Sequence, residues 1–153
     1  MTARPVLLPG TQCVIEDFGD DGTLARHLLE IGITPGLQLT IVRRGPFGDP
    51  VEVAMPGTHS VVLRSGELAS LRCRFVSGPL AALPCSATGR YRVRALVGGQ
   101  RFARRVAGYG LQPGREFNLL PCSRGRYRLR SGDDAPVVEL GRGEAVRLIV
   151  EPA

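Results

Sequence analysis

The chain repeats itself with a period of about 78 residues, and this repeat limits the folds open to it more than any other feature. Residues 26–36 align with residues 104–114, where an arginine, a glycine and a Pro-Gly pair recur 78 positions later. Further on, the Leu-x-x-Gly-Glu pattern of residues 63–67 recurs in residues 140–144. A repeat of this length has the size of a small domain rather than of a solenoid unit. The sequence therefore predicts two tandem domains, residues 1–78 and residues 79–153.

Each repeat begins with an apolar stripe at helical spacing. Leu24, Leu28 and Ile31 lie at i, i+4 and i+7, and Phe102, Val106 and Tyr109 do the same 78 residues later. This spacing predicts one short helix per repeat with a single buried face. The glycines that follow, Gly32 and Gly110, predict helix ends with positive φ, and the Pro-Gly pairs predict type II turns.

After each turn the apolar residues alternate with polar ones, which is the period of a half-buried strand. Twenty glycines and twelve prolines also suit short strands and tight turns better than a helical bundle. We count about five short strands and one helix per repeat. This content predicts a mostly β protein in which each domain is a small closed barrel, because closure removes exposed strand edges.

The motifs of the first repeat resemble the FeoA family. The resemblance is carried by Glu30-Ile-Gly-Ile-Thr-Pro-Gly36, by the strand ending Val42-Arg-Arg44, by the hairpin Gly45-Pro-Phe-Gly-Asp-Pro-Val51 and by the close Leu63-Arg-Ser-Gly-Glu-Leu68. It covers essentially the whole chain as two tandem copies. It implies two Src homology 3-like β-barrels, each with one short helix, and no catalytic activity.

The family resemblance further implies a cytoplasmic accessory role in ferrous iron uptake, at the inner face of the membrane. The implied partner is the ferrous iron permease, which has a cytoplasmic GTPase domain, and anionic lipid headgroups are a second candidate. At the level of the family, transition metal ion binding stays open. The second copy replaces the Pro-Phe-Gly-Asp-Pro hairpin by residues 122–126, so we expect the two copies to recognise different surfaces.

Two groups of residues are candidates for partner binding. In the first hairpin, Phe47 is an apolar side chain on an expected exposed turn, flanked by Pro46 and Asp49, and it either anchors a partner or folds back on its own barrel. In the second repeat, alternation places three arginines on one face of a strand, and Arg90, Arg92 and Arg94 do the same on another. The three arginines are Arg126, Arg128 and Arg130. Together the stripes form either a positive plate for acidic groups or an ordinary solvated face.

The positive charge of the chain is concentrated in the second repeat. All 20 basic residues are arginine; residues 79–153 hold thirteen of them against six acidic residues, whereas residues 1–78 hold seven against eight. Biased codon usage explains such a composition equally well, and an acidic partner is the alternative. The alternative function is a module that binds nucleic acid or a regulator through the second repeat. Nucleic acid is disfavoured because few aromatic residues are free for stacking.

The sequence offers little for catalysis or metal binding. It has two histidines, no lysine and no nucleophile beside a base, so we expect no enzyme, no cofactor, no small-molecule substrate and no metal site. His27 and His59 are read as surface residues, and Asp20-Asp21-Gly22-Thr23 as a helix N-cap rather than a cation site. The four cysteines show no C-x-x-C pair, so a disulfide framework is not expected. No stretch predicts a spanning helix or a signal peptide.

Overall fold

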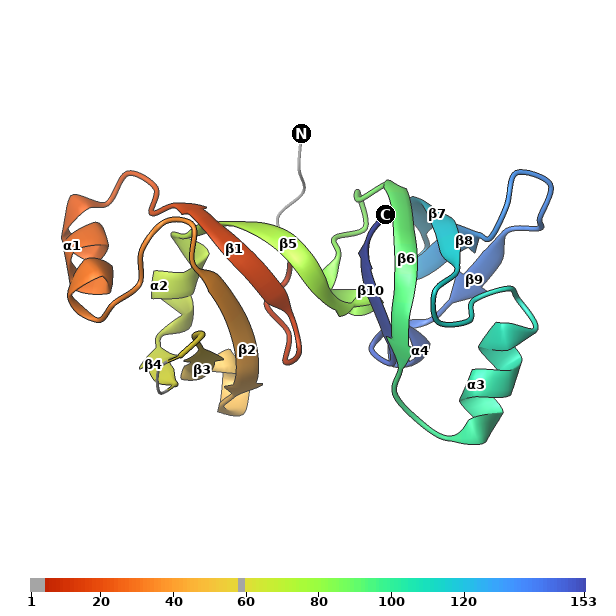
Figure 1. Ribbon diagram of the computed structural model, residues 1–153, viewed down its shortest axis with the longest axis horizontal. Helices are drawn as coiled ribbons and strands as arrows, with labels where there is room; N and C mark the ends of the chain where they lie inside the picture. Colours follow the sequence, from red (N-terminus) through yellow and green to blue (C-terminus); the bar gives the residue numbers. More distant parts are fainter. Residues whose placement is uncertain (1–4, 58–59) are drawn as a thin grey trace. The chain divides into compact units, whose positions relative to one another are not determined.

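The computed structural model describes residues 5–57 and 60–153, which fold into two compact units (Figure 1). The first unit is Leu7–Val76. The second unit is Ser77–Ala153, joined by Pro5 and Val6, whose Val6 amide donates to the Ala82 carbonyl at 2.6 Å. No helix in the described ranges is long and apolar enough to cross a bilayer.

In the first unit a helix follows the first strand and a second helix precedes the last. The elements are β1 (Gln12–Asp17), α1 (Gly22–Glu30), β2 (Gln38–Arg44), the 3₁₀ turn η1 (Pro46–Gly48), β3 (Val51–Ala54), β4 (Val61–Leu63), α2 (Ser65–Ala69) and β5 (Arg72–Pro79). The hydrogen-bonded strand order is β5-β1-β2-β3-β4.

The second unit has the same succession. Its elements are η2 (Leu80–Ala82), β6 (Gly89–Leu96), α3 (Gln100–Ala107), β7 (Glu116–Ser123), β8 (Arg126–Arg130), β9 (Val138–Leu140), α4 (Arg142–Ala145) and β10 (Leu148–Pro152). The strand order β10-β6-β7-β8-β9 corresponds strand for strand to that of the first unit. The sequence repeat is therefore also a repeat of topology.

Two features differ from the sequence expectation. Each unit has a second short helix, α2 or α4, so the expectation of one helix per repeat was wrong. The predicted closed barrels are also not found as closed ladders: among the described strands the order is linear in each unit, from β5 to β4 in the first and from β10 to β9 in the second. The helices explain this, because the chain leaves the sheet through α2 or α4 directly after a strand of only three residues.

The core of each unit is built from the inward residues of alternating strands and from one face of a helix. In the first unit Leu28 packs with Ile15, Leu39, Ile41 and Val53, all nearly inaccessible to solvent. In the second unit Val93, Leu119, Leu129 and Leu148 are buried in the same way around Phe102 and Val106. Tyr109, expected on the buried stripe, is 36% exposed because α3 ends at Ala107, two residues before it.

The segment between the repeats is part of the second unit and not a linker. Leu80, Ala81, Ala82 and Leu83 are each at most 3% exposed. The hydroxyl of Tyr127 donates to the carbonyls of Ala81 and Leu83 at 3.2 and 2.9 Å. Burial in the second unit thus explains why this proline-flanked segment carries no charge.

The predicted glycine turns are confirmed. Gly32 and Gly110 have φ of 90° and 81° just after their helices, and Gly36 and Gly114 have φ of 88° and 89° in the Pro-Gly turns. The turns are closed by hydrogen bonds from Leu37 N to Thr34 O and from Arg115 N to Gln112 O, at 3.1 and 3.0 Å. These bonds and φ values are those of type II turns.

The two helix-terminal glycines give a matched pair of substitutions. An added Cβ meets nothing within 4 Å at Gly32, but at Gly110 it would lie 2.8 Å from the Ser131 Oγ. We expect Gly32→Ala to lower the free energy of unfolding of its unit by about 1 kcal/mol, the cost of positive φ, and Gly110→Ala by about 2 to 3 kcal/mol. Hydrogen exchange of core amides in each unit measures both. Equal losses would contradict the contact with Ser131.

Candidate interaction surfaces

Phe47 is the most exposed large apolar side chain of the described chain. Its relative accessibility is 108%, at the tip of the turn η1 between β2 and β3. Its φ of 60° places a bulky residue in the left-handed region, which costs about 1 to 2 kcal/mol. Because the ring is fully exposed, the interpretation in which Phe47 folds back onto its own unit is wrong. The side chain points to solvent at a cost in backbone energy, which is a pattern found at functional sites.

The hairpin that presents Phe47 is braced on both sides. Its ends are joined by a hydrogen bond from Gly45 N to Pro50 O at 2.7 Å. The Arg44 guanidinium donates to the carbonyls of Gly48 and Leu7, at 3.3 and 2.9 Å. A Cβ at Gly45 would lie 2.2 Å from the Asp49 carbonyl, so only glycine fits there. These contacts restrain the backbone of the tip.

Asp49 ties the same hairpin to α2. Its carboxylate accepts from the Ser65 backbone N–H at 2.6 Å and from the Ser65 hydroxyl at 3.0 Å. These bonds, aided by Arg44 and Arg64, lower the pKa of Asp49 below its ordinary value. Asp49 was expected to bind a partner, but the structure uses its carboxylate within the unit. Pro46 begins the turn η1.

The Asp49 contact has a testable pH dependence. Because its folded-state pKa is depressed, the stabilisation is complete above the ordinary value of 3.8 and is lost as the pH falls through the lower folded value. We expect carboxyl NMR to give a titration midpoint below 3.8 for Asp49, and Ser65→Ala to raise it. Ser60→Ala is the matched control, because the Ser60 hydroxyl bonds Glu52 instead. An unchanged midpoint in Ser65→Ala would exclude the hydroxyl bond as a cause and leave the backbone N–H bond, which the substitution keeps.

The second hairpin is shorter and presents an arginine. Arg124 and Gly125, with φ of 54° and 74°, connect β7 to β8 and are exposed. Positive φ at both central residues is typical of a type I′ turn. The expectation that the two copies present different surfaces stays a prediction, and the tips themselves differ: an aromatic ring in one and a guanidinium in the other.

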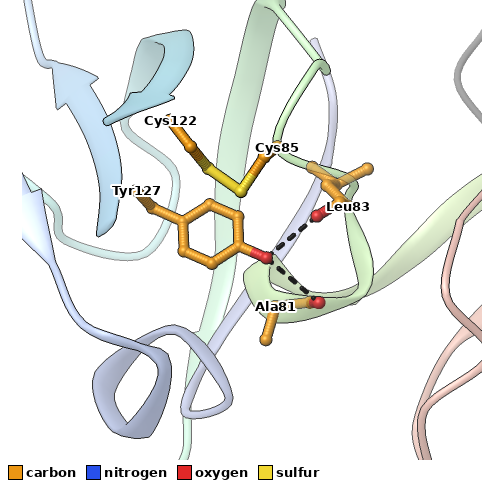
Figure 2. Close-up of a disulfide and its surroundings, with 5 residues drawn as sticks. All are labelled: Ala81, Leu83, Cys85, Cys122 and Tyr127. Atoms are coloured by element: carbon orange, nitrogen blue, oxygen red, sulfur yellow. Dashed lines mark hydrogen bonds between the residues drawn. A yellow bond between two sulfur atoms is a disulfide. The ribbon is translucent and has the colours of Figure 1, made fainter. Parts of the chain in front are cut away.

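A disulfide joins Cys85 to Cys122 at the base of the second hairpin, beside the Tyr127 ring (Figure 2). The two Cα atoms are 4.8 Å apart, within the range that disulfides require, and Cys122 N donates to Cys85 O at 3.0 Å. The expectation of no disulfide was wrong. The cysteines lie 37 residues apart in the sequence, and only the pairing of β6 with β7 brings them together.

The arginine stripe of β8 alternates as predicted. Tyr127 and Leu129 are buried, at 6% and 0% exposure, while Arg126, Arg128 and Arg130 lie on the outward face. One carboxylate, that of Glu139, lies beside this stripe. Arg126 Nε is 3.4 Å from Glu139, and Arg128 faces the same glutamate in register on β9.

The stripe of β6 is more fully paired. Glu116 on β7 accepts from both Arg90 and Arg92, at 2.5 and 2.9 Å, and Arg92 also lies 3.7 Å from Glu151. Both stripes lie on the sheet formed by β6, β7 and β8, but the face carries mixed charge. Only arginines with N–H donors that are not taken up by these carboxylates can therefore contribute to the expected positive plate.

The remaining polar candidates have structural roles. Asp21 caps α1, accepting from Thr23 N and Leu24 N at 3.1 Å, as predicted. His27 lies 3.5 Å from Glu67, and His59 falls outside the described residues. A hydrogen bond with Cys73, together with burial, raises the pKa of the Cys13 thiol. Within residues 5–57 and 60–153, no group of three or more His, Cys, Asp or Glu side chains could hold a metal ion.

The pair His27 and Glu67 has a counterpart in the second unit. Arg105 and Glu144, 78 and 77 residues later, form an ion pair at 3.2 Å between α3 and α4. The Gly-Glu pattern of the repeat is thereby explained, because each glutamate joins its short helix to the longer one. In the first unit Glu67 also accepts from the Arg64 backbone N–H at 3.0 Å.

The braced hairpin with its exposed aromatic lies within the segment that matches a protein-family model. Residues 7–74 match the FeoA domain. This match takes in nearly all of the first unit, less than half of the chain, and stops within β5. FeoA proteins are accessory factors of ferrous iron transport. No curated protein matches the chain.

Solved structures extend the likeness. The iron(II) transport protein A of Clostridium thermocellum is 29% identical, with a TM-score of 0.66 over 96% of this chain and 85% of that one. FeoA of Stenotrophomonas maltophilia, solved with zinc and described as a prokaryotic SH3 domain protein, is 29% identical over 48% of this chain and 89% of its own, with a TM-score of 0.39. A FeoA-like protein of Clostridium acetobutylicum is 22% identical, with a TM-score of 0.44 over 49% of this chain and 90% of that one.

Proposed function

We propose that the protein is a cytoplasmic accessory module of ferrous iron uptake, built from two FeoA-like barrels, 1–78 and 79–153, of the Src homology 3 type. The FeoA match of the first unit supports the role, and the likeness to the iron(II) transport protein A, which includes residues of both units, supports the duplication. The module binds and is not an enzyme. Its partner is the ferrous iron permease with a cytoplasmic GTPase domain.

The exposed ring of Phe47 is the single observation that carries this proposal. The ring is exposed to solvent and is held on a braced turn. An aromatic side chain held in this way loses little conformational entropy when it docks. Arg126, Arg128 and Arg130 give a second contact with acidic groups of the permease or with anionic lipid headgroups at the inner face of the membrane. Preferential binding to one state of the GTPase domain then biases its conformation.

The direct test is an amide NMR titration of the full chain with the permease of the same organism in nanodiscs, and with its isolated GTPase domain. We expect shifts to cluster at residues 45–50, with weaker shifts along β8 that fade at physiological salt. Absence of any shift with the complete permease would contradict the proposal. Saturable binding of duplex DNA by the second unit at physiological salt would favour the alternative, a nucleic-acid or regulator module.

A further inference from the structure

We propose that the outward face of the second unit's sheet carries a binding site for a small polyvalent oxyanion, built on Arg90, Asn118 and Arg130. The three residues lie in one row, because Arg90 on β6 pairs with Asn118 on β7, and Asn118 pairs with Arg130 on β8. The strands β6, β7 and β8 are neighbours in the sheet (Figure 1). Asn118 lies between the buried Phe117 and Leu119, and Arg130 follows the buried Leu129, so the row faces away from the core. The site is independent of the proposed docking of Phe47.

The first unit supplies an internal comparison for this row. In the same strands and the same register it has Gln12, Thr40 and Ala54, since Gln12 pairs with Thr40 and Thr40 with Ala54. One copy therefore carries an uncharged row, and the other carries two guanidinium groups on either side of a carboxamide. A common fold does not require this charge, because the uncharged row forms the same ladder.

A pocket of about 330 Å³ opens beside the row. It is lined by Arg90 and Asn118 together with Ser131, which directly follows Arg130, and by Glu116 and Asp133. Its volume is at the lower end of that of small-molecule sites. The guanidinium, carboxamide and hydroxyl groups offer several hydrogen-bond donors at one place, which is what an oxyanion requires.

Two observations show donors that the protein itself leaves unused. Arg130 Nε is buried and has no hydrogen-bond partner in the described chain. Buried polar atoms of folded proteins are nearly always paired, so an unpaired one indicates a missing ligand or water. Arg90 gives one nitrogen to Glu116. A guanidinium has five N–H donors, and that single bond does not exhaust them.

The spacing of the arginines defines the kind of anion. Strands β6 and β8 flank β7, so the Cα atoms of Arg90 and Arg130 lie about 10 Å apart, two strand spacings. An anion with a single charged group, placed over Asn118, reaches both guanidinium groups only if both arginine side chains bend toward it. An anion with two charged oxygen-bearing groups, such as a diphosphate or a dicarboxylate, contacts both and accepts from Asn118 between them.

The test is a titration of the full chain at low salt with pyrophosphate, succinate and inorganic phosphate, followed by amide NMR. We expect saturable shifts at Asn118, Ser131 and Gly132 with at least one of the two probes that carry two anionic groups, pyrophosphate and succinate. The better of these should bind about tenfold more tightly than inorganic phosphate. A response to pyrophosphate identifies a phosphate-based ligand and a response to succinate a carboxylate-based one. No saturable shift with either, or equal affinity for phosphate, would overturn the proposal.

Three variants separate this site from general attraction to a basic protein. Arg130→Gln should weaken binding of the better probe about tenfold. Asp133→Asn removes a negative charge that repels the anion from the pocket lining, and it should strengthen binding of the same probe about threefold. Arg124→Gln removes the same charge from the exposed tip of the second hairpin and should leave affinity unchanged. If Arg124→Gln weakens binding as much as Arg130→Gln, the site does not exist.

Discussion

Replacing Cys85 and Cys122 by serine is expected to lower the free energy of unfolding of the second unit by about 4 kcal/mol. The reason is chain entropy: the bridge closes a loop of 37 residues, and without it the unfolded second unit gains the corresponding freedom. For a unit of this size the loss corresponds to a fall in melting temperature of about 20 °C. The bridge joins β7 to the segment that precedes β6, at the base of the second hairpin, so amide protection should fall there.

Hydrogen exchange resolved by residue measures this, because it follows each unit separately. The first unit is an internal reference and should keep its protection. Cys13→Ser with Cys73→Ser is the matched control, since it removes two thiols without touching the bridge. Adding a reductant to the unaltered protein should lower amide protection in the second unit as much as the double substitution at Cys85 and Cys122 does. A second unit equally stable with and without the bridge would show that the disulfide contributes nothing.

The bridge also has a consequence for the proposed site of action. Cytoplasmic thiols are generally kept reduced, so a cytoplasmic protein would keep this bridge only to the extent that the folded second unit favours it. The stability of the second unit would then follow the redox state of its surroundings, whereas the first unit has no bridge among its described residues. Alkylation of freshly lysed cells followed by mass measurement gives the fraction of oxidised chain.

Local sequence signals were sufficient where the structure is set by a few adjacent residues. The glycine turns, the Asp21 cap and the alternation around Tyr127 and Leu129 were predicted correctly, because φ, capping and burial at these places depend on residues close in sequence. The mostly β content follows from the same alternation. The short helices α2 and α4 were missed because four or five residues are too few to show a helical period.

Features made by strand register could not be predicted in this way. The Cys85–Cys122 bridge and the row of Arg90, Asn118 and Arg130 each bring together residues that are far apart in the sequence. The sequence also indicated an arginine plate, but not that Glu116 would accept from two of its members. The internal repeat was the one signal that could have found the row, because it identifies Gln12 and Thr40 as the counterparts of Arg90 and Asn118.

Phe47→Asn is expected to weaken binding to the ferrous iron permease by about 2 kcal/mol or more, about 30-fold in dissociation constant. The substitution removes the aromatic ring but keeps a residue that tolerates the left-handed conformation. Stability of the first unit should therefore be unchanged, or higher by up to about 1 kcal/mol as backbone strain is relieved. Calorimetric titration and denaturant unfolding measure the two quantities.

The opposite behaviour of affinity and stability is what distinguishes recognition from structure. A ring that packed within its own unit would lower both on removal, whereas a solvent-exposed anchor lowers affinity alone. Leu29→Asn is the control, because Leu29 is also an exposed apolar side chain of the first unit, at 51%, but lies on α1 rather than on the hairpin. Equal loss of affinity in both variants would assign binding to general apolar surface. Loss in Phe47→Asn alone would assign it to the braced hairpin, which presents a fully exposed aromatic ring on a backbone with φ of 60°.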